Sequence, residues 1–474
     1  MKRNTLIIIL TFFISFGCND QLTEEVFSGL GPSNFYSSPE DAESLLNAAY
    51  AQTQGYRDIV RDWLCMGEAT TEIFIEREGG INTWFRPMEE FTWDAGHAYL
   101  LGQWTRWYTG VFYANTVIDN VPDIEMNEER KEQVIAEARF IRALCYYWMY
   151  DFWGPVPLIT TSNTTPQDRP SRPTDDEFVK FVEDEFIAVS EILPTQQVQF
   201  PRATKGAALG FLTRFYMNNH KWELAEQTSQ DIIDLGVYDL FDGASRADLF
   251  EVGNEGDNEF LYVVPYSSAN PQNTYLSHAA PDGYQWEFSP LTNFAADFHV
   301  TSSFVNSFDP ADERLDAIIL EFEDVEGNTV VLGQDKGCSF KLPEEPNQSG
   351  DRTSIDFPLL RYADILLLRA EALNEINGPN QESIDLINEV RGVAGITDLD
   401  LTGQTQQSIR DAIIQERAWE FHTEGLRRQD LIRQGRFISD AVARGWNAKD
   451  YQVLFPIPQV EIDANPNLEQ NDGY

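Results

Sequence analysis

The chain has 474 residues and a formal net charge of −43, with 42% hydrophobic and 13% aromatic residues. A field this negative repels polyanions, which argues against nucleic acid and anionic lipid surfaces as partners. The length is sufficient for one large domain or for several ordinary ones. Most of the 11 tryptophans are expected in the core, but their number leaves room for an exposed platform that stacks on sugar rings.

The start of the chain has the layout of an export signal. A basic beginning is followed by the apolar run Leu6–Phe16 and by a small-residue stretch that ends at Cys18. This run is shorter than the ~20 residues that a membrane-spanning helix needs. The stretch resembles a bacterial lipobox, although Phe16 stands where a smaller residue is commoner. We expect residues 1–17 to be a signal peptide, Cys18 to carry lipid and residues 18–38 to form a tether; plain secretion and an uncleaved anchor are the alternatives.

Apolar residues at three- and four-residue spacing predict amphipathic helices along most of the remaining chain. The expected helical segments are 41–54, 104–120, 132–152, 175–193, 203–218, 222–235, two within 357–395, 408–421 and 426–435, with a further apolar-periodic piece at 63–74. Neighbouring segments form three or four hairpins without strict sequence repetition. This organisation is typical of a mostly α, tetratricopeptide-like superhelical scaffold.

The clearest hairpin is Phe357–Gly395. Its apolar residues recur with helical period from Leu359 to Leu373, which predicts one helix across this stretch. Gly378 suits a left-handed helix cap and Pro379 is unable to continue the helix, so the first helix is expected to end there. A unit of this kind cannot bury its own apolar face and therefore needs neighbours.

Two long parts of the chain lack a helical period. Residues Glu76–Leu101 mix glycine, proline and aromatic residues and are expected to form a surface excursion. Residues 238–359 are rich in turn formers, with strand-like pieces at 260–265, 329–332 and 339–342. Loops of this length are rarely simple connections, which favours a binding role for them. The tail 454–474 is expected to be extended and to wrap the surface.

Several stretches, taken together, resemble the SusD/RagB family. They are Ala138–Leu158, Asp309–Ile319, Phe357–Gly378, Glu416–Gly435 and Leu454–Tyr474, and they follow the family's order over nearly all of the mature chain. The resemblance implies a single SusD-like domain over residues 39–474. It implies four tetratricopeptide-like helix pairs and an irregular part, about residues 236–356, that carries the ligand site.

The same resemblance implies a function. It implies a lipid-anchored, surface-exposed protein of the Bacteroidetes outer membrane that binds oligo- or polysaccharide and delivers it to a TonB-dependent, SusC-like transporter, without catalysis and without a cofactor. Asp20, which closely follows Cys18, fits the surface exposure of such lipoproteins. The alternatives are a peptide- or protein-binding, RagB-like lipoprotein of a nutrient-uptake complex and an exported glycan-active enzyme.

A sugar site without catalysis needs aromatic faces for stacking and planar polar groups for hydroxyl pairs. Two stretches in the irregular parts supply both, and their candidate residues are Asn82, Trp84, Arg86, Asp282, Tyr284 and Trp286. The alternative is that these aromatic residues pack onto the helical core, which we expect for Trp93 and Tyr99. A basic patch for an acidic glycan would combine Arg57, Arg61, Arg77 and Arg86.

Metal and catalytic motifs are missing from the sequence. Its four cysteines have no metal-type spacing, and the chain contains no HExxH, GxSxG or P-loop pattern. After loss of Cys18 to lipidation three cysteines remain, so at least one is unpaired, and Cys145 is expected to be a small buried hydrophobe.

Two acidic stretches invite a chemical interpretation and are better explained structurally. The region Asp309–Asp316 lacks the spacing of a calcium loop, and Asp309 followed by Pro310 predicts a helix N-cap with proline at the first helical position. The charged run 416–428 predicts ion pairs on helix faces, Arg417 with Glu420 and Glu424 with Arg428.

Overall fold

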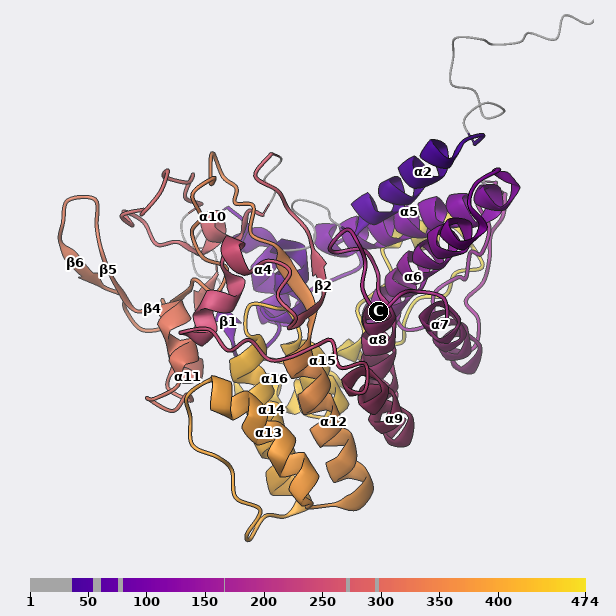
Figure 1. Cartoon of the computed structure of the whole chain (residues 1–474). Coiled ribbons are helices and arrows are strands. Elements are labelled where there is room, and N and C mark those ends of the chain that lie inside the picture. The colour runs from indigo at the N-terminus through magenta and orange to yellow at the C-terminus, as the bar shows by residue number, and fades with distance from the viewer. Residues whose placement is uncertain (1–35, 54–60, 76–79, 166, 270–272, 295–297) are drawn as a thin grey trace, which may run out of the picture.

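Figure 1 shows the computed structural model, which describes residues 36–53, 61–75, 80–165, 167–269, 273–294 and 298–474. The fold is mostly α-helical, as predicted, and the described strands are short. Over the described ranges, no helix is both long and apolar enough to cross a membrane. The signal peptide, Cys18, Asp20, Arg57 and Arg77 lie outside the described residues.

A continuous wall of helices forms the scaffold. Its members are α2 (Pro39–Gln52), α5 (Ala98–Asn120), α6 (Glu128–Trp153), α7 (Asp175–Ser190), α8 (Lys205–Asn218), α9 (Trp222–Ile233), α12 (Tyr362–Asn377), α13 (Gln381–Val393) and α14 (Gln406–Phe421). Each packs on the next: α5 on α2 and α6, α7 between α6 and α8, α9 between α8 and α12, and α12 on α13 and α14. The predicted hairpins are thus present and supply one another's apolar neighbours.

The helices begin and end where the sequence supplies caps. The Thr174 side chain accepts a hydrogen bond from the Glu177 N–H, and the Glu177 carboxylate accepts one from the Thr174 N–H, a capping box that starts α7. α12 ends at Gly378, which adopts a φ of +69°, and Asn380 caps the start of α13. The turn predicted from these residues is therefore confirmed.

The start of the Phe357–Gly395 hairpin differs from the prediction. Residues Phe357–Arg361 form strand β8, which pairs antiparallel with β2 (Phe260–Val264), and the helix begins only at Tyr362. All five residues of each strand are buried. An apolar run as short as Phe357–Leu360 satisfies helical and strand periods equally, and the FLYVV partner, about 100 residues earlier, decides between them.

The loop-rich part lies on the opposite side from α5–α9 (Figure 1). Besides β2–β8 it contains three antiparallel pairs, β1 (Phe74–Ile75) with β3 (His299–Val300), β4 (Ile318–Ile319) with β7 (Cys338–Ser339), and β5 (Glu321–Glu323) with β6 (Thr329–Val331). It also holds the short helices α3 (Trp63–Gly67), α10 (Tyr275–Ala279) and α11 (Ser302–Val305). Two of the strand-like pieces predicted in this part are confirmed with shorter bounds, as β2 and β6, whereas the piece predicted at 339–342 is strand only at Ser339, in β7.

Three local predictions were wrong. The excursion Glu76–Leu101 contains a helix, α4 (Asn82–Glu89), and ends inside α5. Asp309 does not cap a helix: it accepts a hydrogen bond from the Ala311 N–H, and a 3₁₀ helix starts later with Asp312 as its cap. The tail is turn-rich as predicted but includes α17 (Gln459–Ala464). Short helices of this size escape periodicity because they offer only one or two turns of pattern.

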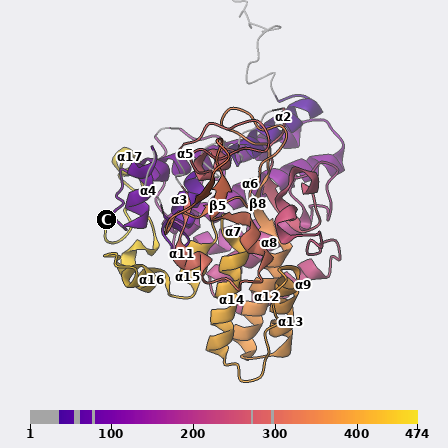
Figure 2. The same cartoon turned by 90° about the vertical axis from the view of Figure 1, so that its left-hand side faces the viewer.

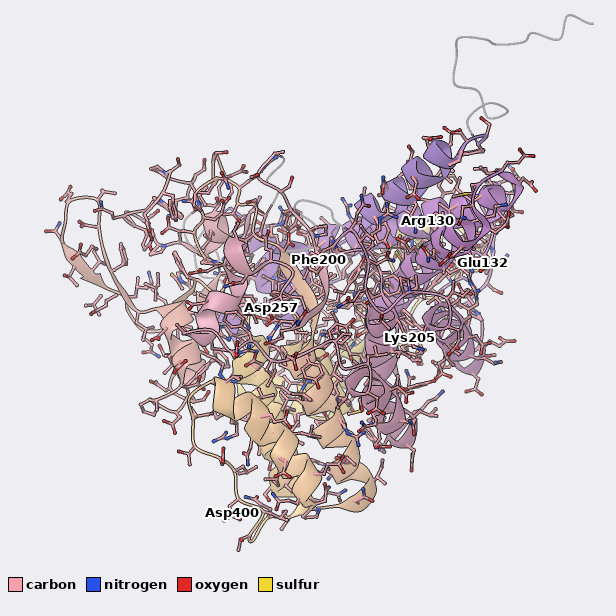
Figure 3. The ribbon with its side chains drawn as sticks, in the orientation of Figure 1. Arg130, Glu132, Phe200, Lys205, Asp257 and Asp400 are labelled. Atoms are coloured by element: carbon pink, nitrogen blue, oxygen red, sulfur yellow. The ribbon has the colours of Figure 1, made fainter. Side chains whose placement is uncertain are left out.

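The C-terminal helices α15 (Arg427–Arg433) and α16 (Phe437–Ala443) follow α14. Figure 2 shows α16, α17 and the C-terminus together on one side, while α12–α14 project at the bottom. Figure 3 places Lys205 on the scaffold side and Asp400 at the tip of the loop that joins α13 to α14, with Phe200 and Asp257 lying between the scaffold and the loop-rich part.

The charged run in α14 is buried, and its partners are not local. Glu420 contacts Arg246, Arg314 and Arg361 at 2.6–3.0 Å, and Arg361 also binds Glu424. Burial alone would raise the pKa of Glu420. The positive charges of Arg246 and, second in size, of Arg361 outweigh burial and lower this pKa well below its usual value. The predicted pairs Arg417–Glu420 and Glu424–Arg428 are therefore wrong, while the structural role of the run is confirmed.

Candidate functional site

The first candidate stretch is presented by α4. Trp84 is 37% exposed, and its ring contacts His97 edge-on at 6.0 Å and Tyr99 at 6.1 Å. The backbone carbonyl of Trp84 lies 2.9 Å from His97 Nε2. Burial lowers the pKa of His97, so the ring is neutral at physiological pH and Nε2 donates this hydrogen bond. Trp84 is thus fixed by its neighbours while part of its indole remains open.

The polar residues beside Trp84 differ in what they can offer. Arg86 is exposed and lies 4.0 Å from the carboxylate of Glu90. An ion pair on the protein surface contributes little binding energy between its two side chains. Asn82 is half-buried at the start of the same helix. Arg86 therefore remains available for a ligand, but it lies two residues after Trp84, which places the two side chains on nearly opposite faces of α4.

The predicted basic patch is only partly described. Arg61 stacks over the Tyr99 ring, with its guanidinium carbon 4.7 Å from the ring centre, and it pairs with Asp62 at 2.6 Å. Arg61, Tyr99 and Trp84 therefore form a continuous stack of planar groups. Because Asp62 neutralises Arg61, this stack presents planar surface more than positive charge.

The second candidate stretch lies along the β5–β6 ribbon. The Gln285 N–H donates to the Glu323 carbonyl, and the Val325 N–H donates to the Gly283 carbonyl. Gly283 adopts a φ of +76°, a conformation that favours glycine, where the chain turns onto the ribbon. The stretch is therefore held in register against a strand and is not a free loop.

Tyr284 and Trp286 form an aromatic pair on this ribbon. Their rings are 5.2 Å apart and nearly perpendicular, and Tyr284 also contacts Phe340 at 5.0 Å and Phe322 at 5.9 Å. Burial and the neighbouring Glu344 carboxylate raise the pKa of the Tyr284 hydroxyl, which stays protonated. Trp286 is half-buried against this group, while Asp282 is fully open to solvent.

The structure brings each stretch together but does not join the two. Among the described residues, no ring contact links Trp84 to Tyr284 or Trp286. On the α4 side, Phe85 packs 5.0 Å from Phe298, which in turn stacks on Tyr275 of α10. Trp286 and Phe340 pack against the same hydrophobic core, so the two candidates share a hydrophobic base without a direct ring contact among the described residues.

Several neighbours of these candidates were missed by reasoning from the sequence. They are His97 beside Trp84, and Phe322, Phe340 and Glu344 beside Tyr284. No local pattern marks them, since each lies in a different segment from the residue it supports. Trp93 and Tyr99 are buried, as predicted, and Trp93 donates its indole N–H to the Tyr474 hydroxyl.

Catalytic and metal chemistry find little support in the described part. No cluster of histidine, cysteine and carboxylate side chains suited to a metal ion occurs there. Cys65, Cys145 and Cys338 are buried, and burial raises the pKa of Cys145 and of Cys338, to about 12 for the latter. Thiols of this kind are unreactive. His422 is equally buried, and desolvation lowers its pKa to about 3.

Comparison with known proteins identifies the family. A family model described as the SusD family matches residues 328–474, and one described as starch-binding associating with the outer membrane matches residues 34–217. Together they cover more than two thirds of the chain.

Full-length relatives and solved structures agree with these matches. The SusD-like protein P25 of Formosa agariphila is 24% identical over 99% of this chain and 98% of its own. The starch-binding protein SusD of Bacteroides thetaiotaomicron is 26% identical over 72% of each chain. A surface glycan-binding protein A of Bacteroides thetaiotaomicron, solved with laminarihexaose, superposes with a TM-score of 0.78 at 20% identity over 92% of this chain and 100% of that one. The chain therefore belongs to the SusD family.

Proposed function

We propose that this protein binds oligo- or polysaccharide at the outer membrane without transforming it. The observation that carries the proposal is Trp84, an indole 37% exposed yet held by Tyr99 and His97. A fixed, open aromatic face is suited to stacking on the apolar face of a sugar ring. Tyr284 and Trp286 offer a second aromatic surface on the same base.

The family relationship supports the same ligand class. One relative is named a starch-binding protein, and one structural neighbour was solved with laminarihexaose. The net charge of −43 favours a neutral glycan over an acidic one. The pairing of Arg61 with Asp62 removes part of the basic patch that an acidic glycan would require.

Binding is tested by electrophoresis through gels that contain laminarin, starch or other neutral and acidic polysaccharides. We expect one neutral polysaccharide to retard the protein and the Trp84→Ala and Trp286→Ala variants to be retarded less. Tyr451→Ala is the matched control, because Tyr451 is 38% exposed but belongs to neither stretch. Full retardation of both single variants and of the double variant would show that these residues are not the site.

Catalysis and peptide binding are separated in the same experiment. Reducing-sugar release is measured on every polysaccharide tested, and we expect none above the buffer rate. Turnover without retardation would replace the proposal with a glycan-active enzyme. Binding of peptides with no retardation by any polysaccharide would replace it with a peptide-binding member of an uptake complex.

The membrane partner follows from family membership. We propose that Cys18 carries lipid, that the protein is exposed on the cell surface, and that it delivers its glycan to a TonB-dependent, SusC-like transporter. Affinity purification of the tagged protein from detergent-solubilised membranes tests the partnership. We expect a barrel transporter in stoichiometric amount; its absence from gently solubilised membranes would remove this part of the proposal.

A further inference from the structure

A groove runs along α5 on the scaffold, outside both candidate stretches. Trp104, Tyr108 and Phe112 line it from α5, and Glu461 of α17 and Asn465, which directly follows α17, line it from the opposite side. Figure 2 shows α17 beside α5. The three aromatic residues are spaced four apart, so they form one stripe on the helix, about 12 Å long at 1.5 Å per residue. We call this feature the α5 groove.

The stripe is not simply part of the core. Trp104 is almost fully buried, Tyr108 is half-buried and Phe112 is 48% exposed, so the stripe opens progressively to solvent. Trp104 packs edge-on against Trp153 at 5.1 Å and against Tyr108 at 5.1 Å, which fixes the closed end. The α5 groove holds a volume of about 510 Å³, within the range of roughly 300–1,000 Å³ found for small-molecule sites.

Polar groups with spare hydrogen-bonding capacity surround this aromatic floor. The half-buried Glu461 carboxylate accepts a hydrogen bond from the Trp104 side chain, and burial raises its pKa. Arg169 is exposed at the rim and makes no ion pair with any described residue. Thr105 and Thr164 add hydroxyl groups. A carboxylate, a guanidinium and hydroxyls around an aromatic stripe form a surface for a ligand with apolar ring faces and many hydroxyl groups.

Other ligand classes fit the α5 groove less well. An anionic ligand would meet Glu461, Asp168 and the field of a chain with a charge of −43. An extended peptide gains affinity by pairing its backbone with a free strand edge, whereas both α5 and α17 use their backbone groups within the helix. A neutral carbohydrate needs neither positive charge nor a strand edge.

The α5 groove and the support of the Trp84 indole lie on different faces of α5. Tyr99, which supports Trp84, precedes Trp104 by five residues, and five residues place the two side chains roughly 140° apart around the helix. We propose that the α5 groove is a second, independent binding subsite for a neutral oligosaccharide. This inference rests on the proposed function, since it takes the same ligand class.

Titration calorimetry with laminarihexaose, and with maltohexaose in parallel, tests the inference by the number of sites. We expect two sites in the unaltered protein and one in the Trp84→Ala/Trp286→Ala variant. We expect Phe112→Ala to weaken the remaining site about tenfold, the loss of one stacking contact, and Glu461→Gln to weaken it further. Leu224→Ala is the matched control, because Leu224 is also 48% exposed but lies on α9.

The outcomes separate the two proposals. One site that vanishes in Trp84→Ala/Trp286→Ala and is unchanged in Phe112→Ala would overturn the α5 groove and leave the proposed function in place. Binding of proline-rich peptides to the α5 groove, lost in Phe112→Ala while hexasaccharide binding persists, would also overturn it. Failure of the unaltered protein to bind either hexasaccharide or any polysaccharide in the gels would overturn both.

Discussion

At the scale of single residues, the sequence could nominate binding aromatics but not their surroundings. Trp84 and Trp286 were chosen because they lie in irregular, polar stretches, and both are at least partly open in the structure. Tyr99 beside Trp84 and Phe340 beside Tyr284 come from other segments, and only the tertiary fold brings them near. Whether these residues bind sugar stays a prediction.

One buried carboxyl makes the stability of the loop-rich part depend on pH. Asp356 precedes β8 and accepts a hydrogen bond from the Tyr266 N–H at 2.7 Å. Burial and the nearby charge of Glu255 raise its pKa from 3.8 to about 8. A raised carboxyl pKa means that the folded state holds the proton more tightly than the unfolded state, so this stability is lost as pH rises from about 4 to about 8.

We expect Asp356→Asn to raise the melting temperature more at about pH 8 than at about pH 5, because asparagine carries no charge and its carbonyl oxygen can still accept the Tyr266 N–H. Thermal unfolding at both pH values measures the difference. The exposed Asp324, whose pKa is lowered mainly by the Asn328 N–H, supplies the control Asp324→Asn. An equal gain for Asp356→Asn at both pH values would contradict the assigned protonation.

At the scale of elements, long helices could be predicted well and short ones could not. α6 and α8 have many turns of pattern and defined caps, so their bounds agree with the expected ones within a few residues. α4 and the strand β8 were missed because their apolar residues are too few to fix a period. The ion pairs of α14 were also missed, since local spacing says nothing of Arg246 or Arg361.

The turn between α12 and α13 offers a clean test of backbone conformation. Gly378 has a φ of +69°, and a methyl group added there would meet nothing within 4 Å. We expect Gly378→Ala to lower the free energy of unfolding by about 1–3 kcal/mol through backbone strain alone, because the φ and ψ of Gly378 lie in a region that essentially only glycine adopts. Gly392, inside α13 and equally uncrowded, is the control. At Gly392, alanine should raise the free energy of unfolding by roughly 0.5–1 kcal/mol. Denaturant unfolding measures both variants, and a lower free energy of unfolding for both would contradict the assignment of strain to Gly378.

The buried ion network joins α14 to the loop-rich part and should be sensitive to the loss of one partner. Arg361 is fully buried and binds Glu259, Glu420 and Glu424 at 2.5–2.8 Å. Removing its charge takes one positive partner from three buried carboxylates, which costs about 3–5 kcal/mol.

We therefore expect Arg361→Met to lower the free energy of unfolding by that amount in denaturant titrations. Lys180→Met removes a cation from an ion pair with Asp184 on the exposed surface, where we expect a change below about 1 kcal/mol. Equal effects of the two substitutions would show that the network adds no more than a surface pair.

At the scale of the whole molecule, the wall of helices and the loop-rich part have separate roles. The wall buries the apolar faces of successive hairpins, and the loop-rich part holds Trp84, Tyr284 and Trp286 by aromatic contacts above a shared hydrophobic core. The α5 groove adds a surface on the wall itself. A polysaccharide held at two places would dissociate more slowly than one held at a single site, because release of one contact leaves the other in place.

The lipid anchor proposed at Cys18 would determine where this surface acts. We expect Cys18→Ala to abolish metabolic labelling with a lipid analogue and to release the protein from the outer membrane, because the anchored form depends on that single thiol. Cys145→Ala is the control, since Cys145 is buried in the fold and cannot be the lipid acceptor. Membrane fractionation and protease treatment of intact cells measure both variants. Retention of the label in Cys18→Ala would place the anchor elsewhere. Loss of the label with intact glycan binding would show that membrane attachment depends on Cys18 and that glycan binding does not.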